Sequence, residues 1–263
     1  MRSPLSGLAP ARRRLVVLAL GIMAAALVIA IGTLTVAGLS GGSRADQSRL
    51  GPVIVVPGYG GGMADLAPLV AELRREGREA VPFVPTQGGT GDLRVQARLL
   101  GDLAERTLSR TGADSVDVIG YSAGGVVARL WIRDDGASVV RRVLTLGSPH
   151  HGSDVATLAA DVAGGCPAAC EQLAPDSDLL RRLDASDETP DGPSWVTVRT
   201  DDDEIVTPSD SAMLEGALNI RVQELCPTAT TSHGQLPSDP VVQATLSSVL
   251  GRLPPAVPQG VTC

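Results

Sequence analysis

Ser122 has glycines two residues before and two residues after it, in the segment Gly-Tyr-Ser-Ala-Gly at 120–124. An apolar, β-branched stretch at 116–119 precedes this G-x-S-x-G motif and predicts a buried parallel strand. Apolar residues at helical spacing follow at 125–133 and predict a helix. So tight a strand-to-helix turn needs glycines on both sides of the serine, because larger neighbours would make the backbone collide with itself. A serine in such a turn is typical of a nucleophile. The alternative is a glycine-rich turn with an idle serine.

A serine hydroxyl needs a base within hydrogen-bond reach and an acid that orients the base. The histidines of the chain are His150, His151 and His233. In a sheet of alternating strands and helices the expected chain order is nucleophile, acid, base, and the first two histidines come before any suitable acidic loop. His233 follows the last predicted strand in a loop of small polar residues. We therefore predict that His233 is the base; the alternative is an exposed loop histidine.

Four acidic residues at 201–204 directly follow a predicted strand at 195–199. They therefore lie at the carboxyl edge of the sheet, where ligands bind in open α/β folds. Four consecutive acids cannot all be buried, so most are solvated while one can turn toward His233. We prefer Asp203, because the apolar pair Ile205 and Val206 anchors the loop just after it. The alternatives are Asp201 and Asp202.

An oxyanion hole requires two backbone N–H groups. We expect one from Ala123, which follows the predicted nucleophile. We assign the other to Tyr59, in the glycine-rich loop 56–62 after the first predicted strand, because glycines let backbone approach a substrate closely. A phosphate-binding loop is the competing interpretation. It fails because the loop lacks the G-x-x-x-x-G-K-[ST] pattern and the chain has no lysine.

Strands and helices alternate from residue 51 onward. The predicted strands are 52–56, 79–84, 116–119, 139–146, 195–199 and 218–222. The predicted helices are 66–76, 92–109, 125–133 and 239–250. This alternation predicts an α/β fold, with a mostly parallel sheet covered by helices on both faces. Residues 153–193 interrupt it with weak helical stretches rich in Asp, Ala, Pro and Gly.

The amino-terminal part of the chain has the pattern of an export signal. A basic segment at 1–14 precedes an uncharged apolar run of 25 residues at 15–39. That run exceeds the ~20 residues needed to cross a bilayer core and the ~7–15 residues of a cleaved signal peptide's apolar core. We expect a membrane anchor with its arginines in the cytoplasm and the rest of the chain outside. The alternative is a long signal peptide, cut near 36–38 or shortly after, which would make the protein secreted.

A polar linker at 40–50 leads to one domain at 51–263. This domain carries a net charge of −12, because the first fifty residues hold six arginines and one aspartate of a chain at −7. An acidic exported domain argues against a nucleic-acid partner. We expect no cofactor, and the sequence leaves the oligomeric state open.

The four cysteines all lie in the predicted exported part. They are Cys166, Cys170, Cys226 and Cys263. An even number in an oxidising compartment favours two disulfides, of three possible pairings. We prefer Cys166 with Cys170 and Cys226 with Cys263, because the second bond would fasten the carboxyl-terminal tail to the domain. A metal site is the alternative, but Cys-x3-Cys has no nearby histidine partner.

Segments spread over 51–250 together resemble the small exported bacterial lipases and esterases of the α/β-hydrolase superfamily. They are Val-Val-Pro-Gly-Tyr-Gly-Gly at 55–61, Ile-Gly-Tyr-Ser-Ala-Gly-Gly at 119–125, Leu-Gly-Ser-Pro-His-His-Gly-Ser at 146–153, Asp-Glu-Ile-Val-Thr-Pro at 203–208 and Ser-His-Gly at 232–234. The resemblance implies the α/β-hydrolase fold and a triad of Ser122, Asp203 and His233. It also implies backbone donors at Tyr59 and Ala123. Many relatives carry His-Gly where this chain has Pro57-Gly58; because the donor is the next backbone N–H, we expect the oxyanion hole to be preserved.

This resemblance implies a serine carboxylic-ester hydrolase that acts on an ester or lipid outside the cytoplasmic membrane through an acyl-enzyme. An acyltransferase or thioesterase on the same triad is one alternative, and a non-catalytic binding protein of the same fold is another. The segment 153–193 is typical of a cover over such a site. A disulfide between Cys166 and Cys170 would make it a fixed wall, which favours soluble or short-chain esters.

Overall fold

The computed structural model describes residues 44–156 and 166–263, together with residues 9, 14, 19, 21–23 and 25–27. The chain divides into two units, 1–43 and 44–263. The predicted basic segment 1–14 and membrane segment 15–39 lie almost entirely outside the described residues, so the anchor stays a prediction. None of the helices that the structure describes combines the length and the apolarity that a bilayer span requires.

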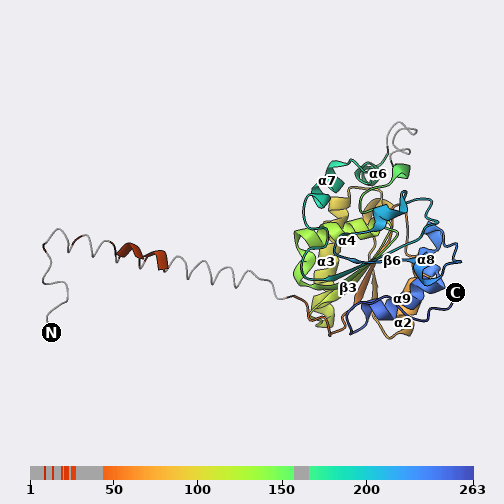
Figure 1. Cartoon of the computed structure of the whole chain (residues 1–263), viewed down its shortest axis with the longest axis horizontal. Coiled ribbons are helices and arrows are strands. Elements are labelled where there is room, and N and C mark those ends of the chain that lie inside the picture. The colour runs from red at the N-terminus through yellow and green to blue at the C-terminus, as the bar shows by residue number, and fades with distance from the viewer. Residues whose placement is uncertain are drawn as a thin grey trace. The chain divides into compact units, whose positions relative to one another are not determined.

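Within the described residues, a six-stranded parallel sheet forms the centre of unit 44–263 (Figure 1). The strands in chain order are β1 (Val53–Val56), β2 (Ala80–Pro82), β3 (Val116–Tyr121), β4 (Val140–Leu146), β5 (Ser194–Arg199) and β6 (Leu218–Arg221). Their order across the sheet is β2-β1-β3-β4-β5-β6. The predicted α/β fold with a parallel sheet is confirmed, and so is each predicted strand, with ends that differ by at most a few residues.

Helices cover both faces of the sheet. They are α2 (Ala67–Arg75), α3 (Leu93–Thr111), α4 (Ala123–Asp134), α6 (Ala168–Gln172), α7 (Asp178–Asp184), α8 (Val222–Leu225) and α9 (Pro240–Leu250). Ile54 and Val56 of β1 pack with α3 and α4, whereas Val53 and Val55 pack with α2 and α9. Figure 1 shows α3 and α4 on one side of the strands, and α2 and α9 on the other. This alternation along β1 is what a strand buried on both faces requires.

The insertion 153–193 contains the short helices α6 and α7, which pack against the domain. Three leucines of α7 are buried in the core cluster that contains α3 and α4. The backbone N–H of Ala169 in α6 donates to the Thr90 carbonyl at 3.1 Å. A disulfide joins Cys166 to Cys170, and a second joins Cys226 to Cys263. Both predicted pairings are therefore present.

A buried ion cluster closes the amino edge of the sheet. Asp117 in β3 is fully buried, and its Oδ2 accepts hydrogen bonds from Arg78 and Arg141 at 2.5 Å each. Both guanidinium groups also donate to the carbonyl of Leu250 at the end of α9. The cluster thereby joins β3 to β4, to the segment before β2 and to the end of α9.

Candidate active site

Ser122 forms the turn between β3 and α4 with φ 52° and ψ −128°. A residue other than glycine costs about 1–3 kcal/mol in such a conformation, so the surrounding structure must hold it there. A Cβ at Gly120 would lie 2.5 Å from the Cα of Gly125, and a Cβ at Gly124 would lie 2.4 Å from the carbonyl oxygen of Val56. The glycines of the motif are therefore needed because backbone segments touch on both sides of the serine.

Asp203 and His233 form a buried pair at the carboxyl edge of the sheet. The Nδ1 of His233 lies 2.9 Å from the Oδ2 of Asp203, and their side chains are 7% and 1% exposed. The other oxygen of Asp203 accepts hydrogen bonds from the backbone N–H groups of Ile205 and Val206, at 3.0 and 2.7 Å. These bonds compensate the carboxylate for its lost water. The pair leaves the Nε2 of the imidazole directed away from the acid.

The other acids of this loop face solvent. Asp201 pairs with Arg221 at 3.3 Å, and the carboxylate of Asp202 accepts a hydrogen bond from Gln223 at 3.3 Å. Both side chains are exposed. Of the three acids considered from the sequence, the structure thus brings Asp203 to His233 and leaves the other two at the surface.

The serine turn and the Asp203–His233 pair lie on the same edge of the sheet. The backbone N–H of Ser122 donates to the carbonyl of Leu146 at 2.9 Å. The next residue, Gly147, packs on the pair so closely that a Cβ there would lie 3.1 Å from both Oδ2 of Asp203 and Nδ1 of His233. No described residue forms a hydrogen bond with the Ser122 hydroxyl or with Nε2 of the imidazole. In enzymes without substrate, catalytic contacts of this kind commonly tighten only in the complex.

The loop after β1 lies against the nucleophile turn. A Cβ at Gly58 would lie 2.9 Å from the Cβ of Ser122, so the backbone that leads to Tyr59 passes directly beside the serine. Ala123 is the first residue of α4, where backbone N–H groups have no intrahelical acceptor. Ala123 therefore lies at the positive end of a helix dipole, and the backbone directly before Tyr59 adjoins Ser122.

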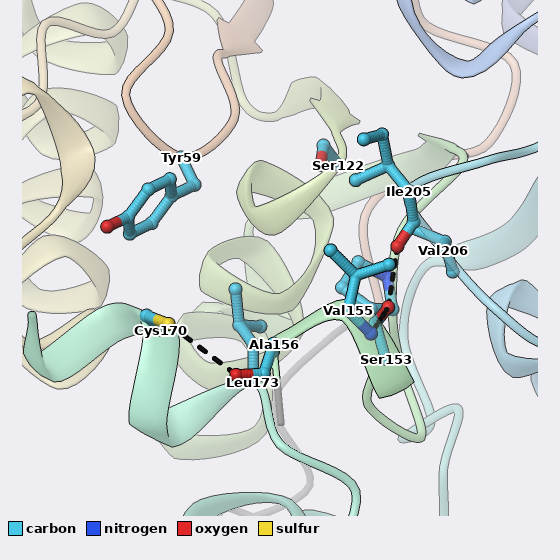
Figure 2. Close-up of a pocket in the computed structure, with 10 residues that line it drawn as sticks. Tyr59, Ser122, Ser153, Val155, Ala156, Cys170, Leu173, Ile205 and Val206 are labelled. Atoms are coloured by element: carbon cyan, nitrogen blue, oxygen red, sulfur yellow. Dashed lines mark hydrogen bonds between the residues drawn. The ribbon is translucent and has the colours of Figure 1, made fainter. Parts of the chain in front are cut away.

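An apolar pocket of about 150 Å³ opens beside Ser122 (Figure 2). It is lined by Tyr59, Ser122, Pro149, Ser153, Val155, Ala156, Cys170, Leu173, Ile205 and Val206. The wall opposite the serine comes from residues 153–156 and from α6 with its disulfide-bonded Cys170. Ile205 and Val206 belong to the turn that also holds Asp203. The loop of the acid and the disulfide-bonded insertion thus shape the same cavity.

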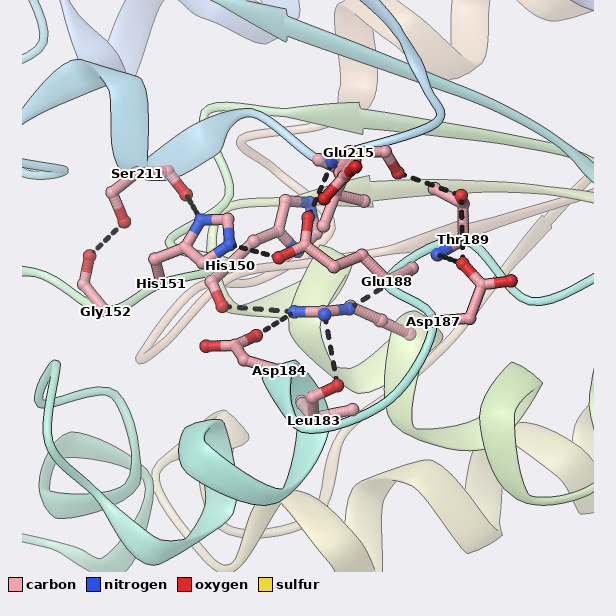
Figure 3. Close-up of polar contacts among 12 residues, drawn as sticks. His150, His151, Gly152, Leu183, Asp184, Asp187, Glu188, Thr189, Ser211 and Glu215 are labelled. Carbon is pink, nitrogen blue, oxygen red and sulfur yellow. Dashed lines mark hydrogen bonds and ion pairs between the residues drawn. The ribbon is translucent and has the colours of Figure 1, made fainter.

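His150 and His151 belong to a separate polar network (Figure 3). His150 is fully buried, with Nε2 3.1 Å from the Oγ1 of Thr145. Burial, and then the charge of Arg129, hold the pKa of His150 well below its usual value, so its ring is neutral. The Nε2 of His151 lies 2.7 Å from the Oε1 of Glu188. Neither ring is bonded to the acid loop that holds His233.

Arg129 of α4 is the centre of that network. It is 1% exposed and donates to Asp184 at 2.9 Å, and to the carbonyls of His150 and Glu188 at 3.2 Å each. His151, Asp184 and Glu188 carry ligand atoms within 4.8 Å of one another, as a metal site would. Here the guanidinium supplies the positive charge beside Asp184, and the imidazole is bonded to Glu188. The network therefore ties the 150–152 loop to the insertion.

Sequence reasoning missed Arg129, although a charge inside the apolar stripe of a predicted helix is a usable signal.

Tyr121 and Glu204 also contact His233, and sequence reasoning assigned them no role. The Tyr121 hydroxyl donates to the carbonyl of His233 at 3.2 Å, and Glu204 accepts the backbone N–H of His233 at 3.1 Å. Their only signal in the sequence is position, because each directly adjoins a predicted catalytic residue.

Comparison with known proteins gives a match to the family described as the PGAP1-like alpha/beta domain over residues 83–162. That segment contains β3, α4 and β4, and with them the serine turn.

Solved structures resemble a larger part of the chain. Aspergillus fumigatus lipase B superposes with a TM-score of 0.69 at 17% identity over 80% of this chain, which spans 55% of that lipase. The mature form of the Bacillus licheniformis lipase BlEst2 superposes with a TM-score of 0.57 at 20% identity, and the match covers 68% of this chain and 87% of that lipase. The lin2722 gene product of Listeria innocua superposes with a TM-score of 0.57 at 15% identity, and the match covers 78% of this chain and 95% of that protein. With its parallel sheet and its strand–serine–helix turn, this chain has the α/β-hydrolase fold, and the proteins it resembles include lipases of that superfamily.

Proposed function

We propose that the chain is a serine hydrolase of carboxylic esters, with Ser122 as nucleophile, His233 as base and Asp203 as the acid that orients the base. The observation that carries this proposal is the buried 2.9 Å contact between Asp203 and His233 at the sheet edge that bears the strained serine. A carboxylate buried against an imidazole favours the charged ring that forms when the ring accepts a proton.

These positions support the following reaction. The Ser122 hydroxyl attacks the ester carbonyl while Nε2 of His233 accepts its proton, and Asp203 stabilises the resulting imidazolium. The backbone N–H groups of Tyr59 and Ala123 stabilise the oxyanion, and each such donor is worth about 10²–10³ in rate. The imidazolium then protonates the leaving alcohol. Water activated by the same imidazole attacks the acyl-enzyme, releases the acid and restores the serine.

The pocket supports a short acyl chain as the favoured substrate. Its volume is about 150 Å³ and its lining is apolar, and a cavity of about that size holds a molecule such as benzene. We therefore expect esters of short acyl chains to be hydrolysed faster than esters of long ones. The side chain of Gln172 in α6, which bonds to Leu93 and Asp92 at 2.8 Å each, supports a fixed wall at this point, and the Cys166–Cys170 disulfide constrains α6 itself.

We further propose that the catalytic unit acts outside the cytoplasmic membrane, held by its amino-terminal segment or released from it. The basic and apolar segments at 1–39 and the disulfides of unit 44–263 support this location, because disulfides persist in oxidising compartments. Fractionation of expressing cells tests it. Protein confined to the cytosol with reduced cysteines would contradict the proposal.

The test of the chemistry is hydrolysis of nitrophenyl esters of graded chain length, with Ser122→Ala as the blank. We expect Ser122→Ala to abolish turnover and labelling by a fluorophosphonate, and Ser247→Ala, which alters an exposed serine of α9, to leave both unchanged. Retention of most turnover in Ser122→Ala would rule out the proposed nucleophile. Labelling without ester turnover would point to another acyl acceptor or substrate.

A further inference from the structure

His233 lies in an irregular part of the chain and must be held there. It follows an irregular loop after α8 and begins the 3-10 helix His233–Ser238. The Ser232 cap fastens this short helix, since the Ser232 N–H donates to the side chain of Gln235 at 2.9 Å. That bond stabilises the helix locally but does not relate the imidazole to the serine turn. The contacts that do so come from two other segments.

Tyr121 provides the first of these contacts. It ends β3, directly before Ser122, and its hydroxyl donates to the His233 carbonyl at 3.2 Å. The two rings lie with their centroids 5.2 Å apart and their planes tilted by 33°. Burial, followed by the negative charges of Asp203, Asp65 and Glu204, raises the pKa of this phenol. The hydroxyl therefore stays protonated and remains a donor at neutral pH.

Glu204 provides the second contact. It directly follows Asp203, and its Oε2 accepts the backbone N–H of His233 at 3.1 Å. The loop at 203–204 thus holds the histidine twice, because Asp203 binds the ring and Glu204 binds the backbone. Because Glu204 is exposed, this hydrogen bond is weaker than it would be if it were shielded from water.

We propose that Tyr121 and Glu204 are positioning residues for the base, an inference that rests on the proposed function. The backbone N–H of His233 is held by the neighbour of the acid, and its carbonyl by the neighbour of the nucleophile. The backbone of His233 is thereby held in place relative to both the acid and the nucleophile. This matters for rate because a displacement of about 1 Å in a catalytic group can cost about 10²-fold. A purely stabilising role would instead lower the melting temperature and leave turnover by the folded enzyme unchanged.

The test measures kcat and KM for nitrophenyl acetate in Tyr121→Phe, Glu204→Ala and Glu204→Gln. Phenylalanine keeps the ring contact and loses the donor, so we expect kcat to fall about 10-fold with KM within about 2-fold of wild type. We expect a similar loss for Glu204→Ala. Glu204→Gln should recover most of it, because an amide oxygen still accepts the backbone N–H. Asp202→Asn is the matched control, as an exposed acid of the same loop, and should leave kcat unchanged.

A fluorophosphonate inactivation rate adds a readout that does not depend on ester binding, and should fall in parallel with kcat. Ser122→Ala separates the two possible failures. If it abolishes turnover while Tyr121→Phe and Glu204→Ala keep kcat within 2-fold of wild type, the positioning role is wrong and the proposed function stands. If Ser122→Ala remains active, the proposed function and this inference both fall.

Discussion

Gly124→Ala should disable the site without removing any functional group. Gly124 lies in the first turn of α4, and a Cβ there would stand 2.4 Å from the carbonyl oxygen of Val56 and 2.6 Å from that of Pro57. Both obstacles are backbone atoms of the segment that leads to Tyr59. An added methyl group therefore cannot be accommodated by a side-chain rotation, and the helix and the loop must move apart.

The size of the effect follows from these distances. Ordinary contact for a Cβ begins near 3.4 Å, so the two segments must separate by about 1 Å. Overpacking of this kind costs about 1–3 kcal/mol of stability, which for a domain of this size lowers the melting temperature by about 2–12 °C. Displacing the Tyr59 N–H by about 1 Å from the oxyanion should lower kcat by about 10²-fold.

Steady-state hydrolysis of nitrophenyl acetate and thermal unfolding measure the two effects. Gly62→Ala is the matched control, because it changes a glycine of the same loop 56–62 where a Cβ meets nothing within 4 Å. We expect it to keep wild-type kcat and melting temperature. A Gly124→Ala enzyme with wild-type kcat would show that the loop and α4 do not pack as tightly as these contacts require, and would refute the reasoning.

Two further predictions concern the acid and the buried histidine. Asp203→Asn should lower kcat/KM for nitrophenyl esters by about 10⁴-fold, because an amide does not stabilise the imidazolium, whereas Asp201→Asn should change it less than 2-fold; the opposite ranking would mean that Asp201 is the acid. The pKa of His150 is lowered in the folded state, so its contribution to stability is complete above the unfolded value near 6.5 and is lost as the pH falls from there toward the folded pKa. Between about pH 7.5 and about pH 5, the free energy of unfolding measured in urea should fall by up to about 1.4 kcal/mol per pH unit below 6.5 in the wild type. This fall should be absent in His150→Gln. If the free energy of unfolding changes equally with pH in the wild type and the variant, the prediction is wrong.

Patterns that are local in the chain predicted most of the fold. The apolar stretch at 116–119, the glycines around Ser122 and the apolar stripe after them each act within a few residues. Hydrophobic period and backbone sterics were therefore sufficient to predict a strand, a tight turn and a helix. The structure begins α4 at Ala123 rather than at residue 125, because Ser122 alone makes the turn between the end of β3 at Tyr121 and the helix.

Choices among chemically similar side chains needed the folded chain. The run at 201–204 offers consecutive carboxylates, and spacing cannot say which one turns inward. The backbone N–H groups of Ile205 and Val206 and the ring of His233, thirty residues later in the chain, together select Asp203. The contacts of Tyr121 and Glu204 with His233 were likewise invisible in the sequence, because they join segments that meet only when parallel strands bring their carboxyl ends to one edge of the sheet.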